Sequence, residues 1–551
     1  MTKAKHPAVL WTVALVAVLC VCSPRAIAQG PTSPVHVEGT LNLSSDWYSS
    51  QGIDERQPHS TYRAILAPTI VLFDQIRLPF QLYVTSDDRG VVQPFNQFGV
   101  NPQFWGWITL HAGYYSARIS DLTIGDSRIL GGGVELTPGP FKFSFLYGRI
   151  QQSAAADSTS GFRGAYQRWA WAAKVGYGEE SSLHLHLNLM RAWDDSSSLK
   201  SPFPDITPME NLVASLQLGI PIWGRAVFLS GEVAAAALSN DTRSPVLDGA
   251  PSALLNIFTP RQSSQVDGAA KASLTIMPSP TWSLMFAGQW VGPGFVTLGY
   301  AQLPNDVLQG TVTPMVRLFN NALLLRGSIG LQFNNLRSTR IATTQRTIGS
   351  ATVSIQPSTD WGLDMQYSNY GMQSNPTNDT LRIDNISQSL SISPRYSFPA
   401  FGASSTAVLS YSLQTFTDFN TVTGALSNNR TNAGVGSWIM AWPSTLRLST
   451  TAMYTICSTA LIQTIVKTGS ETIGYSFFNN TLTANLTGAY TIVVTNGDDG
   501  QFSARIGFSY TPGKWGTFTL GFATSQYIYD PNSGSSSYRE HTGNFQYSYA
   551  F

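Results

Sequence analysis

Residues 542–551, TGNFQYSYAF, carry the clearest structural signal in this 551-residue sequence. One parity of the stretch is wholly aromatic: Phe545, Tyr547, Tyr549 and Phe551. The other parity is polar or small: Asn544, Gln546, Ser548 and Ala550. Because successive side chains of a β-strand point to opposite faces, the pattern predicts a strand with one apolar and one hydrated face. In a transmembrane β-barrel the aromatic face would meet lipid.

The composition fits many strands of this kind. Charged residues make up 12% of the sequence, about half of the usual globular share, while the mean hydropathy is near zero at −0.03. Few charges without long apolar runs is the mixture that alternating strands produce. The formal net charge of +1 gives no electrostatic support for nucleic-acid binding.

Residues 1–28 read as a secretory signal peptide. Lys3 and Lys5 form a basic start, residues 8–22 an apolar run, and Ala26-Ile27-Ala28 a small-residue cleavage site. We expect export of a mature chain that keeps Cys457 alone and therefore forms no intramolecular disulfide. No later segment has 18 consecutive apolar residues, so membrane insertion would rest on strands.

Alternation then recurs from Val35 to Phe551. Between the predicted strands, tight turns rich in Pro, Gly and Asn alternate with longer polar loops, as in outer-membrane barrels with short periplasmic turns. The pattern predicts an all-β fold: one antiparallel up-and-down transmembrane barrel over residues 29–551, of about 24 strands within a range of 22 to 26. A soluble repeat protein or several β-sandwiches could also supply many strands, but one face stays apolar throughout and no linker interrupts it.

Residues 87–130 fit this pattern poorly. They either hide two short strands or fold into the lumen, and we favour the lumen because the segment carries an apolar load that a solvated loop would expose: Phe95, Phe98, Phe104, Trp105 and Trp107. A circular barrel of about 24 strands, spaced about 4.8 Å and tilted near 40°, would be roughly 48 Å wide. Such an opening needs a filling, and residues 239–265 are a second candidate for it.

Charged side chains recur on the polar parity of the predicted strands. These candidates for the lumen face are Arg326, Arg395, Arg447, Arg505, Lys271, Glu232 and Asp364. A charge that faces acyl chains costs roughly 2–4 kcal/mol for Arg or Lys at the midplane, so their shared parity predicts which face is hydrated. They could form ion pairs that stiffen the wall, or they could line a solute path.

Tryptophans mark the short turns. Five of them lie in or beside predicted turns and predict an aromatic belt at one membrane interface: Trp223, Trp282, Trp361, Trp442 and Trp515. Outer-membrane lipid is therefore one expected partner.

Chemistry-bearing motifs are weak. His184 and His186 share a strand face and could share a metal, but they read more simply as polar lumen residues because no carboxylate or Cys motif accompanies them. The acidic stretches Asp194-Asp195 and residues 496–500 read as solvated loop tips, since the twelve-residue calcium loop is absent. No nucleophile motif accompanies the scattered histidines, so we expect neither an enzyme nor a cofactor.

Two resemblances add to these patterns. The ending with Tyr547, Tyr549 and Phe551 resembles the C-terminal signal that barrel-assembly machinery recognises in bacterial outer-membrane proteins. Residues 101–149 and 300–337, with WITLHAGYYS and LFNNALLLRGSIGLQFNNLR, resemble an uncharacterised family of large outer-membrane barrels from Bacteroidota-type bacteria. The resemblance implies an outer-membrane location and assigns no site.

Together these observations predict a passage or assembly function. A channel or transporter for an unidentified solute leads. The alternative is a scaffold or subunit of an outer-membrane secretion or assembly complex, with a partner protein that fills the lumen. Because the strand pattern starts soon after the predicted cleavage site, we expect no N-terminal plug domain of the kind that TonB-dependent receptors carry.

Overall fold

The computed structural model describes residues 34–86, 97–156, 161–199, 205–223, 226–248, 257–300, 303–376, 378, 382–420, 422–495, 497–531 and 534–551. The predicted signal peptide, residues 1–28, lies outside this range. The strands of the first half are β1 Val35–Gln51, β2 Ser60–Leu72, β3 Ile76–Thr85, β4 Gln97–Val100, β5 Gln103–Phe104, β6 Ile108–Ala117, β7 Ser127–Leu136, β8 Phe141–Gln151, β9 Gln167–Tyr177, β10 His184–Asp195, β11 Glu210–Ile222, β12 Val227–Ser239, β13 Ser264–Ser279 and β14 Trp282–Val291. The second half has β15 Val307–Leu318, β16 Leu323–Asn334, β17 Ala342–Ile355, β18 Trp361–Pro376, β19 Asp384–Ala400, β20 Ala403–Asp418, β21 Asn429–Ala441, β22 Arg447–Thr459, β23 Gln463–Phe477, β24 Leu482–Val494, β25 Asp498–Tyr510, β26 Thr517–Ile528 and β27 Tyr538–Ala550, with the short helices α3 Gly424–Ser427 and η3 Gly513–Trp515.

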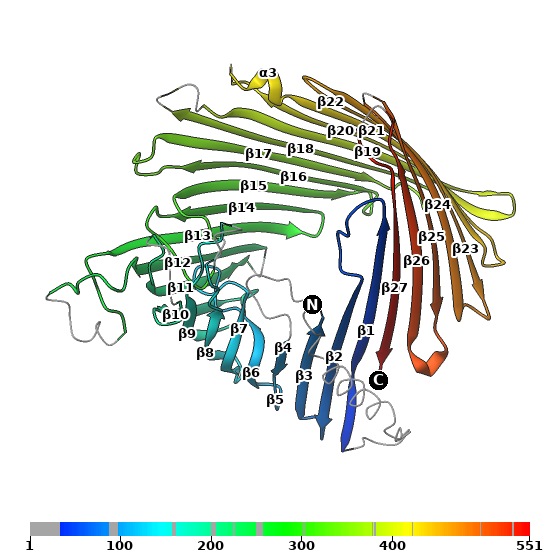
Figure 1. The fold of residues 1–551 in the computed structure, drawn as a ribbon. Coiled ribbons are helices and arrows are strands. Elements are labelled where there is room, and N and C mark those ends of the chain that lie inside the picture. Colours follow the sequence, from blue (N-terminus) through cyan, green and yellow to red (C-terminus); the bar gives the residue numbers. More distant parts are fainter. Residues whose placement is uncertain are drawn as a thin grey trace.

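The strands form one closed antiparallel barrel (Figure 1). Each strand pairs with its neighbours in chain order, and β1 pairs with β27 from Thr40↔Ala550 to Gln51↔Arg539, which closes the sheet. β4 and β5 both lie between β3 and β6, so the 27 strands of the described residues occupy 26 wall positions. The predicted fold class is confirmed, and the count is two above the expected 24.

The two additional wall strands come from the segment expected to fold into the lumen. Residues 87–96 lie outside the described part, but β4, β5, β6 and the start of β7 belong to the wall. Phe98, Trp105 and Trp107 are exposed, with 54%, 57% and 40% of their surfaces accessible, and they do not fill the interior. Of the described residues 97–130, the stretch 118–126 is the one that leaves the wall to enter the lumen.

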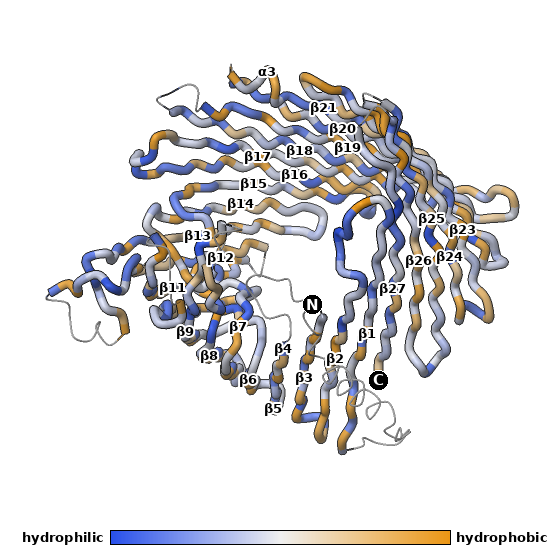
Figure 2. The backbone as a smooth tube through the Cα atoms, in the orientation of Figure 1, coloured by the Kyte–Doolittle hydropathy of each residue, from blue (hydrophilic) through white to orange (hydrophobic). Residues whose placement is uncertain are grey.

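Alternation along the strands separates an outer and an inner face (Figure 2). In β10 the even positions from His184 to Asp194 are buried, whereas Leu185 and Leu187 on the odd positions are 49% and 58% exposed. A closed sheet satisfies its backbone hydrogen bonds internally, so its apolar outer face can lie in hydrocarbon. The fold therefore indicates an outer-membrane location.

Both chain ends of the barrel lie at the rim of the short turns. With 26 wall positions, β1 leaves this rim and β27 returns to it. The loops at the opposite rim include the long connections between β10 and β11 and between β12 and β13. By the arrangement of outer-membrane barrels, the short turns are periplasmic and the long loops extracellular.

No helix among the described residues is long and apolar enough to cross a membrane.

Candidate functional site: the barrel lumen

The strand register places the seven predicted charged residues on one face. Glu232 is paired in register with Lys271. Arg326 is paired with Thr352 of β17, and Thr352 is paired with Gln366 of β18. Asp364 lies two residues from Gln366 and therefore points to the same face. Arg395, Arg447 and Arg505 follow on the same face of β19, β22 and β25. This is also the face that residues 118–126 contact, so it is the lumen face.

Six of the seven residues fall into two groups, and the seventh, Asp364, accepts a hydrogen bond from the Ser354 hydroxyl at 2.7 Å. Lys271 and Glu232 form an ion pair at 3.4 Å, and only 1% of the Glu232 side chain is accessible. The four arginines are different. Among the described residues no carboxylate lies within ion-pair distance of Arg326, Arg395, Arg447 or Arg505, and all four side chains are exposed. One pair therefore stiffens the wall, while the arginines stay accessible from the lumen.

Two loops fold into the barrel and meet there. We call residues 118–126, between β6 and β7, loop A, and residues 292–300, between β14 and β15, loop B. The Thr297 hydroxyl of loop B donates to the Thr123 carbonyl of loop A at 2.6 Å, and Ser127 donates to the Gly299 carbonyl at 2.6 Å. A side chain at Gly299 would put its Cβ 2.6 Å from the Met190 sulfur, so the close approach requires glycine.

The wall holds both loops through polar and apolar contacts. Asn211 of β11 is fully buried: its Nδ2 donates to the Val296 carbonyl at 2.9 Å and the Ala237 carbonyl at 3.1 Å, and its Oδ1 accepts from the Leu298 amide at 3.0 Å. The apolar core between loops and wall includes Ile119, Leu122, Ile124, Met190, Val213 and Phe295. This core is what fills one side of the lumen.

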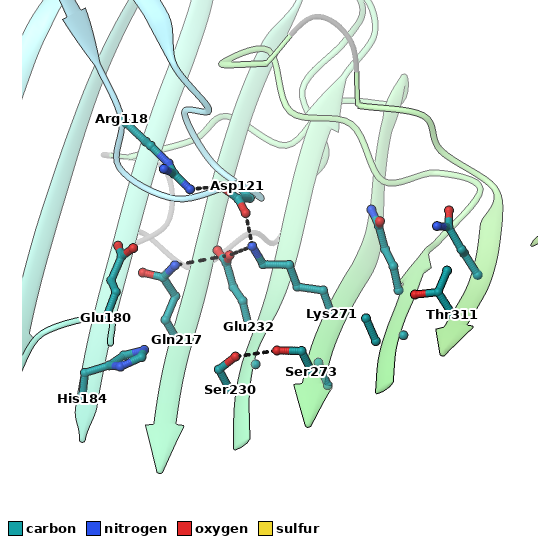
Figure 3. A pocket seen from close by; sticks show the side chains of 16 residues that line it. Arg118, Asp121, Glu180, His184, Gln217, Ser230, Glu232, Lys271, Ser273 and Thr311 are labelled. Atoms are coloured by element: carbon teal, nitrogen blue, oxygen red, sulfur yellow. Dashed lines mark hydrogen bonds and ion pairs between the residues drawn. The ribbon is translucent and has the colours of Figure 1, made fainter. Parts of the chain in front are cut away.

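A polar pocket of about 320 Å³ lies beside loop A on the wall of β10–β15 (Figure 3). Figure 3 shows Asp121 of loop A pointing toward Lys271, with Glu232 and Gln217 beside them. Lys271 contacts both Asp121 and Glu232, and Arg118 donates to Asp121 at 2.9 Å. These contacts fasten the tip of loop A to the wall.

Ionisation of Asp121 depends on these partners. Burial works against its charge, but the hydrogen bonds and charges of Lys271 and Arg118 outweigh burial and hold the pKa of the Asp121 carboxyl below its ordinary value. Asp121 is 46% accessible and Lys271 30%, so salt screens the contact. High salt or protonation of Asp121 therefore weakens the contact between loop A and the wall.

The two predicted histidines contact backbone carbonyls of the turn beside them. The His184 and His186 rings lie 5.0 Å apart on the lumen face, His184 Nδ1 is 2.9 Å from the Ser182 carbonyl, and His186 Nε2 is 3.0 Å from the Gly178 carbonyl. Within the described part of the chain, no three His, Cys, Asp or Glu side chains are placed to hold a metal ion. Their contacts fix the turn between β9 and β10.

The interpretation of Asp194 as a solvated loop tip is wrong. Its side chain is 2% accessible and accepts two hydrogen bonds from Arg168, at 2.7 and 3.1 Å, and one from the Met209 amide at 3.0 Å. Asp195 caps the following turn by accepting from Ser197. Cys457 faces the lumen near the end of β22, where the Thr431 hydroxyl lies 3.5 Å from its sulfur.

The five predicted belt tryptophans all lie at the short-turn rim. Trp223 and Trp442 directly follow β11 and β21, Trp282 and Trp361 begin β14 and β18, and Trp515 lies in η3. Trp223 is 83% exposed. The rim geometry agrees with a role in anchoring to lipid, which stays a prediction.

Sequence reasoning placed Trp223 at the rim but missed five other aromatic residues in the rim turns. Six turns place an aromatic residue in the left-handed region, at φ between 48° and 54°: Phe73, Trp105, Trp223, Phe319, Phe401 and Phe478. Bulky residues rarely adopt this conformation, although two-residue hairpin turns of type I′ demand it. The signal that could have found them is an aromatic residue followed by Asp, Asn or Gly between two alternating stretches.

The C-terminal aromatics extend the wall. Tyr547, Tyr549 and Phe551 form a stacked row with ring centres 6.4 and 5.7 Å apart. The Phe551 backbone pairs with Gly39 through bonds of 2.8 and 3.0 Å. Their function as an assembly signal stays a prediction.

The other half of the lumen face is uncovered. Along β16–β26, side chains at the strand centres such as Gln332, Gln366 and Thr487 are partly or fully accessible. Hydroxyl pairs cross between the strands here: Ser368–Ser389, Ser393–Ser410, Ser437–Thr451, Thr468–Thr491 and Thr472–Thr487. This wall is hydrophilic and accessible, in contrast to the side filled by loops A and B.

Comparisons with known proteins give distant likenesses. No family model and no curated protein matches the sequence. OccAB3 of Acinetobacter baumannii is 14% identical, with a TM-score of 0.31 over 69% of this chain and 99% of that chain. The ferric enterobactin receptor PfeA of Pseudomonas aeruginosa is 11% identical, with a TM-score of 0.41 over 94% and 82%. The usher pore PapC is 10% identical, with a TM-score of 0.28 over 93% and 98%.

These values are too low to carry an argument about function. The barrel assignment rests on the strand pairing of the chain itself.

Proposed function

We propose that this protein is an outer-membrane channel that lets a hydrophilic solute cross along the uncovered half of its lumen. The observation that supports it most is the contrast between the two halves. Loops A and B cover part of the lumen face of β7–β14, while the lumen face of β16–β26 keeps accessible hydroxyl, amide and guanidinium groups. A wall that is hydrated on its inner face at the depth of the membrane provides a path for water-soluble molecules.

The loops explain how a barrel of this size can retain selectivity. By the spacing used above, a circular barrel of 26 strands would be roughly 52 Å wide. Filling one side narrows this opening without an additional domain. The fastening of loop A by Lys271 and of loop B by Asn211 keeps the filling in place.

The experiment is reconstitution of the purified protein in planar bilayers with a matched pair of variants. Gln366→Trp narrows the uncovered half from within, whereas Tyr367→Trp changes the adjacent residue on the outer face, where Tyr367 is 40% exposed. We expect steady conductance in the wild type, a reduced value in the Gln366 variant and no change in the Tyr367 variant.

A folded barrel that does not conduct would reject the proposal. Co-purification of that silent barrel with other outer-membrane subunits would favour the alternative, a scaffold in a secretion or assembly complex.

A further inference from the structure

Four arginines are spaced regularly around the uncovered half. Arg326 lies on β16, Arg395 on β19, Arg447 on β22 and Arg505 on β25, so an arginine near the short-turn rim occurs on every third strand. Arg346 of β17 shares this lumen face but lies nearer the opposite rim. Each lies within the part of its strand nearest the short-turn rim, because β16 and β22 begin, and β19 and β25 end, at that rim. We call these four residues the arginine arc.

The charges of the arc are uncompensated. Three other cations of the wall pair with carboxylates: Arg168 with Asp194 at 2.7 Å, Arg191 with Glu210 at 2.8 Å and Lys271 with Glu232 at 3.4 Å. The described residues provide no such carboxylate for the arc, whose only acidic neighbour on the rim half of this lumen face is Asp364. Asp364 accepts a hydrogen bond from Ser354 at 2.7 Å.

The arc is also accessible, and one of its members packs against a neighbouring strand. All four side chains are exposed on the lumen face. Arg395 lies over Gly362 of the adjacent strand, where a Cβ would come within 2.7 Å of its Nε. A guanidinium group is always charged, and its fork of N–H donors matches the two oxygens of a carboxylate or phosphate.

From this arrangement we propose that the arginine arc is an anion-binding and anion-selecting station near the periplasmic end of the channel, for small solutes that carry a carboxylate or phosphate group. Charged side chains that line a pore raise the local concentration of ions of the opposite sign and exclude those of the same sign. The inference rests on the proposed channel function and adds the charge class of the solute.

The direct test is the reversal potential of the purified protein in a planar bilayer under a KCl gradient. We expect the wild type to favour chloride over potassium by at least about threefold at 0.1 M salt, with a smaller preference at 1 M, where the Debye length falls from about 10 to about 3 Å. The variant R326Q/R395Q/R447Q/R505Q should lose this preference while it still conducts.

A matched control removes the same number of charges elsewhere. R243Q/R382Q/R430Q/R539Q neutralises arginines of the extracellular loops and strand ends, and it should keep the wild-type preference. Addition of succinate or of inorganic phosphate should interrupt the chloride current in the wild type and in the control, but not in the arc variant. Block by succinate alone indicates carboxylate solutes, and block by phosphate indicates phosphorylated ones.

The outcomes separate the two proposals. A protein that conducts without preference for anions, or that keeps its preference in the arc variant, overturns the role of the arginine arc but remains consistent with a channel. Absence of block by both oxyanions overturns the binding station. A folded barrel without conductance contradicts the channel itself.

Discussion

Replacing Asn211 by Leu should release loop B and open the lumen. The substitution keeps the number and branching of the side-chain heavy atoms but removes three hydrogen bonds: those to the Val296 and Ala237 carbonyls and that from the Leu298 amide. Two of these bonds hold loop B, so at about 1 kcal/mol for each bond the attachment of the loop weakens by roughly 2 kcal/mol. The ratio of attached to released loop then falls by a factor on the order of thirty.

Single-channel recording measures this release. We expect Asn211→Leu to show a larger mean conductance and frequent transitions between levels, because loop B moves in and out of the lumen. The barrel itself should remain folded, since the strand ladder is unchanged, and unboiled samples should keep their gel mobility. Asn485→Leu, on the lumen face of β24 in the uncovered half, is the matched control and should leave the conductance levels steady.

A folded Asn211→Leu protein with wild-type conductance and noise would refute the reasoning, because loop B would then not restrict the lumen.

Three further predictions concern the fastening of loop A and the end of the chain. Since the pKa of Asp121 is lowered in the folded protein, the stabilisation from its charge is complete above its ordinary pKa of 3.8 and is lost as the pH falls below that value. We therefore expect the conductance to rise on acidification below about pH 4. Asp121→Asn should show the high conductance already at neutral pH. Lys271→Met leaves Glu232 buried without its cation and should lower the free energy of unfolding by about 3 kcal/mol in detergent denaturation, whereas Lys271→Met combined with Glu232→Met should recover most of the loss. Phe551→Ser should reduce the amount of barrel assembled in the outer membrane, measured by gel mobility of unboiled membranes, without changing the stability of the fraction that folds.

The wall was predictable from the sequence because its signal is local. Each strand shows its own alternation, and a face that meets lipid must be apolar along its whole length. The parity of Glu232 and Lys271, read from single strands, agrees with their direct pairing in the barrel. The tight turns were visible for the same reason, although the left-handed aromatics such as Phe319 were overlooked.

The filling of the lumen was not predictable because its contacts are remote in sequence. In the sequence nothing distinguishes Ile124 from other apolar residues, whereas in the fold it packs with Met190 and loop B. The Thr123 carbonyl accepts a hydrogen bond from a hydroxyl 174 positions away. The aromatic load near Trp105 pointed to the wrong part of the segment, because an apolar residue beside a turn can face lipid as well as a core. Pairing of charges is equally remote, so the sequence could not separate Lys271 from the arginines.

Thiol accessibility tests the central claim, a lumen filled on one side and hydrated on the other, most directly. In a Cys457→Ser background, single cysteines would replace Gln366 on the uncovered lumen face, Val213 on the covered face, and Leu486 on the outer face, where it is 52% exposed. The purified proteins would be treated in lipid vesicles with a water-soluble thiol reagent.

The account predicts rapid modification of the cysteine at 366, with a fall in conductance, and protection at both 213 and 486. Rapid modification at 213, or protection at 366 in a folded barrel, would contradict it.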